Sequence, residues 1–533
     1  MSSSSYRLTA ALLVLAACSD PSEPATSVDV LIDAGECTQA VADRVVVRVF
    51  DHEGALVETF DRSVADGLEF PTGVRLSPRG GDASRTWRVE AEVVSVDGVA
   101  LSEMSARGGY SEGVRREYDL PFDDSCIGIS CGPNETCRAA LCVDDFEPTA
   151  SLDAPLASCP AIAWVDGTAG ADGESCLDHD APCATVAHAF NSHVQAGQGI
   201  VVFVHGASTY EVRTGDQSVV YVRTLDGGEQ RTPRVFRAWP GTGRPTFDAS
   251  NGRMGFRIHG AHVIIDGFEV HGGQGSGVSF NGPEVVAGVV RNCEIWGNGI
   301  GPVEVFFNEC GIVLNNQVSG ITIVDNVIRD NVAGPSDPGR TAHFPTGIFA
   351  NSRPDLFIAR NTISGHAGDG IYLGDSDRAV IRNNVIFDNT VGISLSGSEA
   401  VIEDNALCDH RVSGISLFGG TSSAVRHNTV VGADAFAINM SEFARWQVSQ
   451  NILAHNAGFG ISGDGDPMDR ENLYFMNAMG HTNGIPRDEP DSDLMDMDPL
   501  LVDVASCDLH LGDGSPARGA ATDGSDLGAR FRD

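Results

Sequence analysis

The chain has 533 residues, of which 62 are glycines and 7% are aromatic, and its formal net charge is −38. This length allows several domains and a large core, and the abundant glycine favours turn-rich β structure over a helical enzyme. All 35 basic residues are arginines, because the sequence contains no lysine. The acidity argues against nucleic acid or anionic membrane surfaces as partners, and a polyanionic substrate would need a bridging cation or a local arginine patch.

Residues 1–18 have the features of a lipoprotein signal peptide. Arg7 precedes an apolar run at residues 8–17 that is too short to span a bilayer. Leu15-Ala16-Ala17-Cys18 resembles the bacterial lipobox, which implies cleavage before Cys18 and lipidation of its sulfur. The alternative is an ordinary secretory peptide with an accidental cysteine. We therefore expect a lipid-anchored protein of the bacterial outer membrane or cell surface, or otherwise a secreted one, with a polar tether at residues 19–36.

Twelve cysteines follow Cys18, and an even number in an oxidising compartment favours disulfides. Metal binding is the other interpretation, but histidines do not cluster with these cysteines at zinc-ligand spacing. The disulfide candidates are Cys126, Cys131, Cys137, Cys142, Cys176, Cys183, Cys293 and Cys310. The first four crowd a segment, residues 124–145, that resembles a truncated EGF-like module, and their three possible pairings stay open. The next two flank one loop and the last two bracket one insertion, so each couple can pair.

Residues 37–123 are expected to form a small immunoglobulin-like β-sandwich. The stretches RVVVRVFDHEGALVETF and RTWRVEAEVVSVDGVAL each join two apolar runs across a glycine-containing turn, which predicts two β-hairpins. No catalytic constellation occurs here, so a role in spacing or adhesion is expected. A linker at residues 146–160 separates this part from the rest.

The third part, residues 161–533, begins with WVDGTAGADG and then APCATVAHAFNSHV. The second stretch places Val186, Phe190 and Val194 on one helical face. We expect a short amphipathic helix that closes the first open end of a long β structure, because an uncovered edge would invite aggregation.

A repeat of 21–23 residues then runs through the chain, and its aliphatic residues align in four columns. One column holds Ile358, Ile381 and Ile402, and the other three are equally regular. Asparagines recur at Asn292, Asn326, Asn361, Asn384, Asn405, Asn428, Asn451 and Asn472. A leucine-rich repeat would need mostly leucine and a longer return segment, whereas here Gly or Asn interrupts each Ile- or Val-rich run. The pattern predicts a parallel β-helix with stacked aliphatic side chains, and an asparagine at each sharp bend in left-handed geometry.

These repeats resemble the right-handed parallel β-helix proteins of the pectin-lyase-like superfamily. The resemblance rests on WVDGTAGADG with APCATVAHA, on the repeated N-x-[IV] and G-I units, and on DPLLVD, LGDGSPARGA and DLGA near the end. It implies an all-β fold, a solenoid preceded by the sandwich and the disulfide-rich segment. It also implies that a polysaccharide lyase would use carboxylates that hold Ca²⁺ and a Lys or Arg base on the outer face of one sheet. A lysine base is excluded, and the paired-Asp, Gly-His-Gly and Arg-x-Lys pattern of pectin hydrolases is missing because Ala367 follows Gly365-His366.

Two insertions, residues 297–311 and 331–347, fall at the same place in consecutive repeats and predict the rim of a binding site. The catalytic candidates beside or within them are Arg340, His343 and Asp369. Asp375 and Asp377 are the candidate Ca²⁺ ligands, if both face outward on one loop. Asp464, Asp466 and Asp469 offer a second acidic loop. The alternative interpretation of each loop is a Gly/Asp turn with solvated charges.

Two functions follow from these patterns. The first is a carbohydrate-binding surface β-helix, which as an enzyme would be a Ca²⁺-assisted polysaccharide lyase or a related carbohydrate-active enzyme. The second is a non-catalytic adhesion or scaffold protein, favoured by the missing lysine and by the appended N-terminal modules. A polysaccharide or cell-surface glycan is the expected partner of either, with no nucleic acid and with membrane contact through the lipid anchor only.

Overall fold

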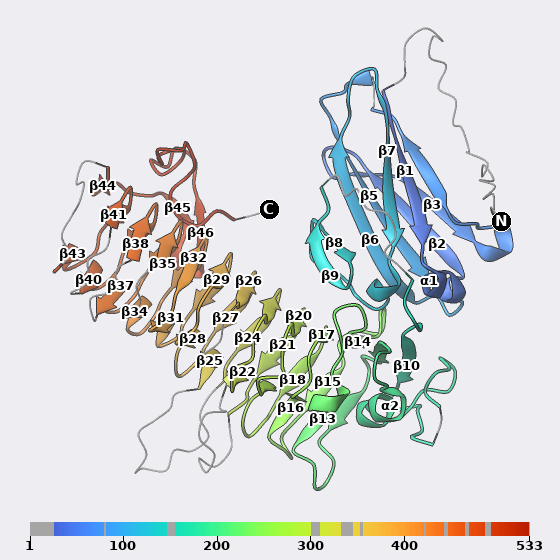
Figure 1. Ribbon diagram of the computed structural model, residues 1–533. Coiled ribbons are helices and arrows are strands. Elements are labelled where there is room, and N and C mark those ends of the chain that lie inside the picture. Colours follow the sequence, from blue (N-terminus) through green and yellow to red (C-terminus); the bar gives the residue numbers. More distant parts are fainter. Residues whose placement is uncertain are drawn as a thin grey trace, which may run out of the picture.

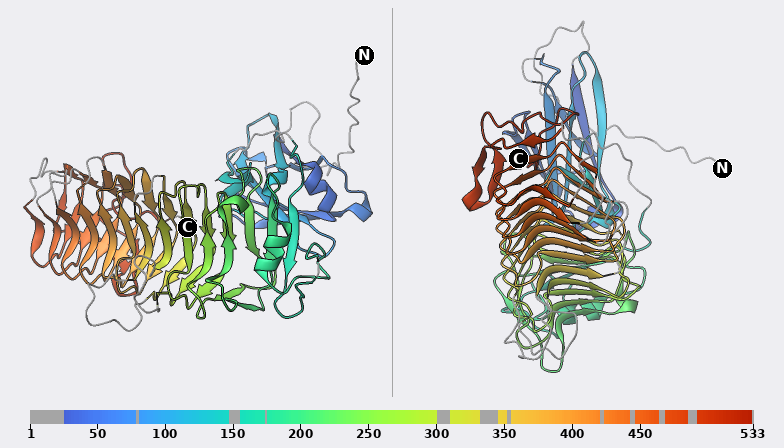
Figure 2. Two further views of the ribbon diagram at one scale, coloured as in Figure 1. Left: turned by 60° about the horizontal axis from the view of Figure 1, so that its bottom comes forward. Right: turned by 90° about the vertical axis from the view of Figure 1, so that its left-hand side faces the viewer.

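A computed structural model describes residues 26–78, 81–146, 155–173, 175–299, 310–331, 345–351, 355–419, 423–441, 446–463, 468–484 and 492–531. It is a right-handed parallel β-helix with two small β-sheets and a disulfide-rich hairpin packed beside its first rungs (Figure 1). Figure 2 shows the rungs stacked along one long axis. The helices are α1 (Glu36–Val41), α2 (Val186–His193) and the 3₁₀ turns Val64–Asp66, Asp124–Cys126, Thr224–Asp226 and Val504–Ser506.

Three long parallel sheets run the length of the β-helix, and each rung contributes one strand to each sheet. The first sheet contains β10 (Ala161–Val165), β11 (Ile200–Val204), β14 (Arg234–Ala238), β17 (Val263–Asp266), β20 (Val289–Arg291), β23 (Thr322–Val324), β26 (Phe357–Ala359), β29 (Ala379–Arg382), β32 (Ala400–Glu403), β35 (Ser423–Arg426), β38 (Trp446–Ser449) and β41 (Met468–Arg470). The second contains β12 (Thr209–Glu211), β15 (Thr246–Asp248), β18 (Glu269–His271), β21 (Glu294–Trp296), β24 (Val327–Arg329), β27 (Thr362–Ser364), β30 (Val385–Phe387), β33 (Ala406–Cys408), β36 (Thr429–Val431), β39 (Ile452–Ala454), β42 (Leu473–Phe475) and β44 (Leu494–Met495). The third contains β13 (Ser218–Val222), β16 (Met254–Ile258), β19 (Val278–Asn281), β22 (Cys310–Asn315), β25 (Thr346–Asn351), β28 (Ile371–Gly374), β31 (Val391–Ser396), β34 (Ser413–Phe418), β37 (Phe436–Ser441), β40 (Phe459–Gly463) and β43 (Gly480–Asn483).

The predicted aliphatic columns form the core of the β-helix. Ile358, Ile381 and Ile402 are direct cross-strand partners in the first sheet, and none of them is exposed. The column of Ile363 and Ile386 lies in the second sheet, and the two remaining columns lie in the third. Alternate side chains therefore point inward in every rung, so that like side chains stack at the spacing of neighbouring strands.

The predicted helix also closes the first rungs. In α2, Val186 and Phe190 are buried, and Val194 at its C-cap packs against the same core. Thr185 caps the helix, because its hydroxyl accepts a hydrogen bond from the His188 N–H at 3.3 Å.

A ladder of buried asparagines marks the corner between the first and second sheets. The Nδ2 group of Asn384 donates to Oδ1 of Asn405 at 2.9 Å, and the same contact joins Asn361 to Asn384 at 3.0 Å. Two details of the prediction are wrong. Asn292 is outside the ladder, because Cys293 occupies that position and its N–H donates to Oδ1 of Asn326. The left-handed residue of each bend is the one before the ladder asparagine, as in Asn383 with φ of 53°.

A second, partly asparagine ladder lies five residues further along each rung, at the corner between the second and third sheets. Its members are Asn298, Asn331, His366, Asn389, His410, Ala433, Asn456 and Asn477. Nδ1 of His366 accepts the Asn331 N–H at 3.2 Å, and Nδ1 of His410 accepts the Asn389 N–H at 3.4 Å. Burial lowers the pKa of each histidine to about 4, so both imidazoles are neutral at pH 7.

Replacing Asn384 with alanine should lower the free energy of unfolding by on the order of 1–3 kcal/mol, because it leaves buried partners unpaired. Asn384 accepts from both the N–H and the Nδ2 of Asn361, each at 3.0 Å, and donates to the Ile358 carbonyl at 3.0 Å. Urea unfolding curves measure the loss. Asn439→Ala, on the outer face of the third sheet, is the matched control and should change stability by about 0.5 kcal/mol or less. Equal losses in both variants would rule out a structural role for the ladder.

The N-terminal part is a two-sheet sandwich. One sheet holds β4 (Thr72–Leu76), β1 (Ser27–Ala34) and β7 (Arg115–Phe122), and the other holds β3 (Leu56–Ser63), β2 (Arg44–Phe50), β5 (Thr86–Val94) and β6 (Ala100–Gly109). The two predicted hairpins are present as β2–β3 and β5–β6. The sandwich begins earlier than expected, since β1 lies within the stretch assigned to the tether at residues 19–36. This strand pairs with both β4 and β7, and its Val28, Val30 and Ile32 are buried.

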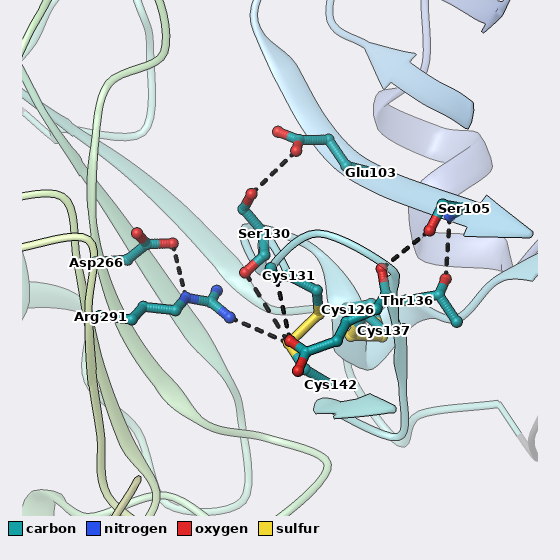
Figure 3. The surroundings of a disulfide bond; sticks show 12 residues. Glu103, Ser105, Cys126, Ser130, Cys131, Thr136, Cys137, Cys142, Asp266 and Arg291 are labelled. Carbon is teal, nitrogen blue, oxygen red and sulfur yellow. Dashed lines mark hydrogen bonds and ion pairs between the residues drawn. A yellow bond between two sulfur atoms is a disulfide. The ribbon is translucent and has the colours of Figure 1, made fainter. Parts of the chain in front are cut away.

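The sandwich shares a core with the outer face of the first sheet instead of standing apart. Ile127 and Ile129 belong to one apolar cluster with Val201, Phe203 and Val235 of the β-helix. The hairpin of β8 (Glu135–Arg138) and β9 (Leu141–Asp144) lies at this junction. Figure 3 shows Arg291 between Asp266, at 3.0 Å, and the sulfur of Cys142, at 3.1 Å. Arg237 of β14 also pairs with Glu103 of β6 at 2.5 Å, so residues 26–146 are fixed to the solenoid by packing and by an ion pair.

The described residues form five disulfides, including three that join candidate cysteines. Cys126–Cys137 and Cys131–Cys142 form one of the three pairings that the sequence left open, and Cys176–Cys183 is the expected pair across one loop. Cys37–Cys159 and Cys408–Cys507 were not anticipated, because their partners lie 122 and 99 residues apart. The predicted Cys293–Cys310 bond is wrong. Both cysteines are buried, and neither forms a disulfide. Five disulfides indicate a protein that folds outside the cytoplasm.

The C-terminal segment returns over the outer face of the second sheet. It contains β45 (Leu501–Asp503) and β46 (Asp508–Leu511), and the Cys408–Cys507 bond ties it to β33. Leu509, Ala517 and Leu527 pack against Ile452 and Leu473. The sandwich and this tail thus cover parts of the first and second sheets. Within the described residues, no helix has the length and apolar character needed to cross a membrane.

Candidate functional site

The sequence-predicted site lies on the third sheet, around strand β28. Asp369 precedes this strand and Asp375 follows it, so the two carboxyl groups stand at opposite ends of one short strand. The described ends of both insertions lead from the second sheet into the third, beside the same edge as Asp369. Arg340 and His343 lie outside the described residues, as does most of each insertion.

Asp369 has an unusual electrostatic environment for a carboxyl group. Burial raises its pKa to about 7, although a hydrogen bond with the Ser394 side chain acts in the opposite direction. Its carboxyl group therefore exists in both protonation states near neutral pH, which is the property required of a general acid or base. Neighbouring Tyr372 is half-buried, and burial raises its pKa as well.

Asp375 and Asp377 both face solvent on the loop after β28. Ser376 between them is fully buried, and its N–H donates to the Ser398 hydroxyl at 3.0 Å, so its two neighbours project outward. This is the arrangement that the Ca²⁺ hypothesis requires of the two carboxylates. Among the described residues, only two groups of three metal-ligand atoms come close enough for one ion, and neither includes Asp375 or Asp377. Both groups contain disulfide-bonded cysteines, which offer no thiolate ligand.

The second acidic loop lies largely outside the described residues. Asp464 and Asp466 lie outside the described residues, and Asp469 is part of β41 in the first sheet. The loop therefore contributes nothing described to the surface around Asp369.

An aromatic pair that sequence reasoning missed stands between Asp369 and Asp375. The rings of Phe349 and Tyr372, from β25 and β28, stack with centroids 5.1 Å apart and planes 8° apart. In the next rung the partner of Tyr372 is Ser394, which is too small to cover the second face of the tyrosine ring. The available signal was an aromatic residue directly between two buried column residues, as Tyr372 is between Ile371 and Leu373, because the alternation of a strand places it outward. Tyr372 therefore offers an open ring face beside two carboxyl groups.

More aromatic side chains continue this surface along the third sheet. Phe436 and Phe459 are cross-strand neighbours in β37 and β40 and are partly exposed, and 37% of Phe418 in β34 is exposed. Asn439 is also partly exposed, whereas Ser394, Ser416 and Ser462 are buried, with only 3–5% of each exposed. We call the outer face of strands β25–β40 of this sheet the aromatic strip.

A different cluster occupies the outer face of the second sheet. The rings of His271 and Trp296 stack at 4.5 Å, and the Arg329 guanidinium lies 5.2 Å from the Trp296 ring centroid. Trp296 donates to Glu269 at 3.0 Å, and Arg329 pairs with Glu294 at 2.7 Å. Both faces of the tryptophan ring are thus covered by protein groups, and the carboxylates have arginine or tryptophan partners. This cluster stabilises neighbouring rungs and leaves no open ring face.

Comparison with known proteins gives matches to parts of the β-helix. The model of the family described as "Right handed beta helix region" matches residues 346–475, and that of "Periplasmic copper-binding protein (NosD)" matches residues 249–401. The comparison with curated proteins gives no match.

Similar solved structures include pectate lyase Pel9A, with 15% identity and a TM-score of 0.46 over 70% of this chain and 96% of that one. A GH136 lacto-N-biosidase from Eubacterium ramulus has 10% identity and a TM-score of 0.46 over 63% of this chain and 68% of its own. An alginate lyase from Paenibacillus sp. str. FPU-7 has 14% identity and a TM-score of 0.39 over 57% of this chain and 97% of its own.

Proposed function

We propose that this protein is an extracytoplasmic, lipid-anchored glycan-binding protein whose binding surface is the aromatic strip of the third sheet. The observation that carries the proposal is the open face of the Tyr372 ring, flanked by Asp369 and Asp375 and continued by further exposed aromatic and amide groups. Aromatic rings pack against the apolar face of a sugar, while carboxyl, amide and hydroxyl groups hydrogen-bond to its hydroxyls. Lipidation at Cys18 would hold this surface at the cell envelope.

Replacing Tyr372 with alanine should weaken glycan binding several-fold, up to about tenfold, because an aromatic contact contributes about 0.5–1.5 kcal/mol. Affinity electrophoresis through polysaccharide-containing gels, followed by calorimetry with the best ligand, measures the loss. The side chain points outward, so the melting temperature should stay near that of the unmodified protein.

Tyr221→Ala is the matched control for this experiment. Tyr221 lies on the same sheet in β13, five strands before β28, and 39% of it is exposed. Its removal should leave binding unchanged. A protein that binds no glycan, or that loses binding equally in both variants, would contradict the proposed surface.

A second candidate function is catalysis at the same place, as a polysaccharide lyase or a related enzyme, and the raised pKa of Asp369 favours it. Asp375 and Asp377 would then hold Ca²⁺ at the substrate. We expect any chain cleavage, followed as new reducing ends or unsaturated products, to fall at least about 100-fold in Asp369→Asn, since a general acid or base contributes roughly 10²–10⁴. Turnover that Asp369→Asn leaves unchanged would exclude this carboxyl group, and binding without turnover would favour an adhesion role.

A further inference from the structure

The third sheet differs from the other two in the charge of its strands. Its eight consecutive strands β19 to β40 contain no Asp, Glu, Arg, Lys or His. The first sheet carries Arg382, Glu403 and Arg426 in strands of the same rungs, and the second sheet carries the Glu294–Arg329 pair. In a chain with a net charge of −38, an uncharged face of this length is a local exception.

The borders of this face are acidic. Asp388, Asp409 and Asp434 lie in successive turns that lead into β31, β34 and β37, and all three are exposed. Asp375 and Asp377 lie on the opposite border. The arginines beside these borders already form ion pairs. Arg411 pairs with Asp388 at 3.1 Å, and Arg378 pairs with Asp355 at 2.6 Å. A polyanion lying on the face would meet carboxylates at both borders and no arginine of the described residues there that lacks a carboxylate partner.

From this charge distribution we infer that the ligand of the aromatic strip is an extended, neutral polysaccharide, and not a polyuronate or a sulfated glycan. The inference rests on the proposed function and names the class of glycan. Seven steps between the eight strands, at about 4.8 Å each, give a face about 34 Å long, which suits a polymer better than a single sugar. Exposed rings and amides bind neutral sugars without a cation, whereas a carboxylated chain would need Ca²⁺ bridges to the bordering aspartates.

The test is binding of the full chain to two sets of polysaccharides. One set is neutral, such as β-glucan, xylan and galactomannan, and the other is anionic, such as polygalacturonate and alginate. Each is measured with added CaCl₂ and with a chelator, at low and high salt. We expect at least one neutral polysaccharide to bind, with an affinity that chelator and salt leave unchanged within about twofold, because screening acts only on charged partners.

The variants separate this inference from the proposed function. Tyr372→Ala and Phe418→Ser should each weaken binding of the neutral polymer, and Tyr221→Ala should not. Two variants of the aromatic strip are used so that one misfolded protein does not decide the result. Binding confined to the anionic set, or dependent on CaCl₂, would overturn the inference and leave a glycan-binding protein. Failure to bind either set would overturn the proposed function itself.

Discussion

Replacing Ile381 with aspartate should prevent the β-helix from folding. Ile381 lies in β29 between Ile358 and Ile402, and none of its surface is exposed. The change removes a large buried side chain, which costs about 2–5 kcal/mol, and buries a carboxylate without a partner, which costs several kcal/mol more. Because whole domains are stable by only roughly 5–15 kcal/mol, we expect no cooperative thermal transition. Circular dichroism melts of the purified protein measure this.

The neighbouring residue supplies the control for that variant. Val380 alternates with Ile381 in the same strand and is partly exposed between Phe357 and Val401. Val380→Asp should cost about 1 kcal/mol or less, as surface substitutions do. If the two aspartate variants melted at the same temperature, the inward column would be wrongly assigned, and with it the orientation of every outward residue of the candidate site.

Acidification to about pH 5 should reduce the contribution of His366 and His410 to stability, while Asp369, whose pKa burial raises to about 7, acts in the opposite direction over the same range. An unfolded histidine titrates near 6.5, whereas the pKa of each buried imidazole is about 4. Below pH 6.5 the unfolded state therefore binds protons at these two histidines that the folded state does not, and their contribution to the free energy of unfolding falls as the pH falls towards 4. The expected loss is roughly 2 kcal/mol for each histidine between about pH 7 and pH 5.

Asparagine is the matched replacement at both positions, because it stands at the equivalent place in other rungs, such as Asn389. Each histidine accepts a backbone N–H through Nδ1, and an asparagine Oδ1 can accept the same hydrogen. Urea unfolding of His366→Asn/His410→Asn between about pH 7 and pH 5 should show a loss about 4 kcal/mol smaller than that of the unmodified protein. Parallel pH profiles for the two proteins would show that these histidines do not govern acid stability.

Most of the fold could be predicted from the sequence repeat. Side chains of the same type at intervals of 21–23 residues can stack only if successive rungs are in register, so Ile381 and its equivalents predicted both the fold and the pairing. The second ladder escaped notice because His366, His410 and Ala433 interrupt its asparagines. Its signal was still present, as a polar residue five positions after every residue of the first ladder except Asn428, which Ala433 follows at that distance.

The disulfides and the domain junction depended on contacts that no local pattern encodes. Cys37 meets Cys159 only because the sandwich packs on the first sheet, and Cys408 meets Cys507 only because the tail folds back over the second sheet. Cys293 and Cys310 are close in sequence, but Cys293 fills a place in the asparagine ladder between the first and second sheets, whereas Cys310 begins β22 in the third. Sequence separation alone therefore misassigned one pair and missed two.

The candidate site was predicted in part. Asp375 and Asp377 face outward on one loop, which was the condition set for a shared Ca²⁺, and their role as its ligands stays a prediction, as does the catalytic role of Asp369. The Phe349–Tyr372 stack was missed, because it joins residues of different rungs and neither belongs to a buried column. The uncharged face depends on the same alternation, since it emerges only when the strands of one sheet are compared side by side.

Hydroxyl-radical footprinting of the full chain, with and without a saturating neutral polysaccharide, tests the central claim most directly. We expect labelling of Phe349, Tyr372 and Phe418 to fall on binding, while labelling of Tyr221, on the same sheet but outside the aromatic strip, stays constant. Unchanged labelling of those three aromatics under a bound polysaccharide, with protection instead on the first or second sheet, would contradict it.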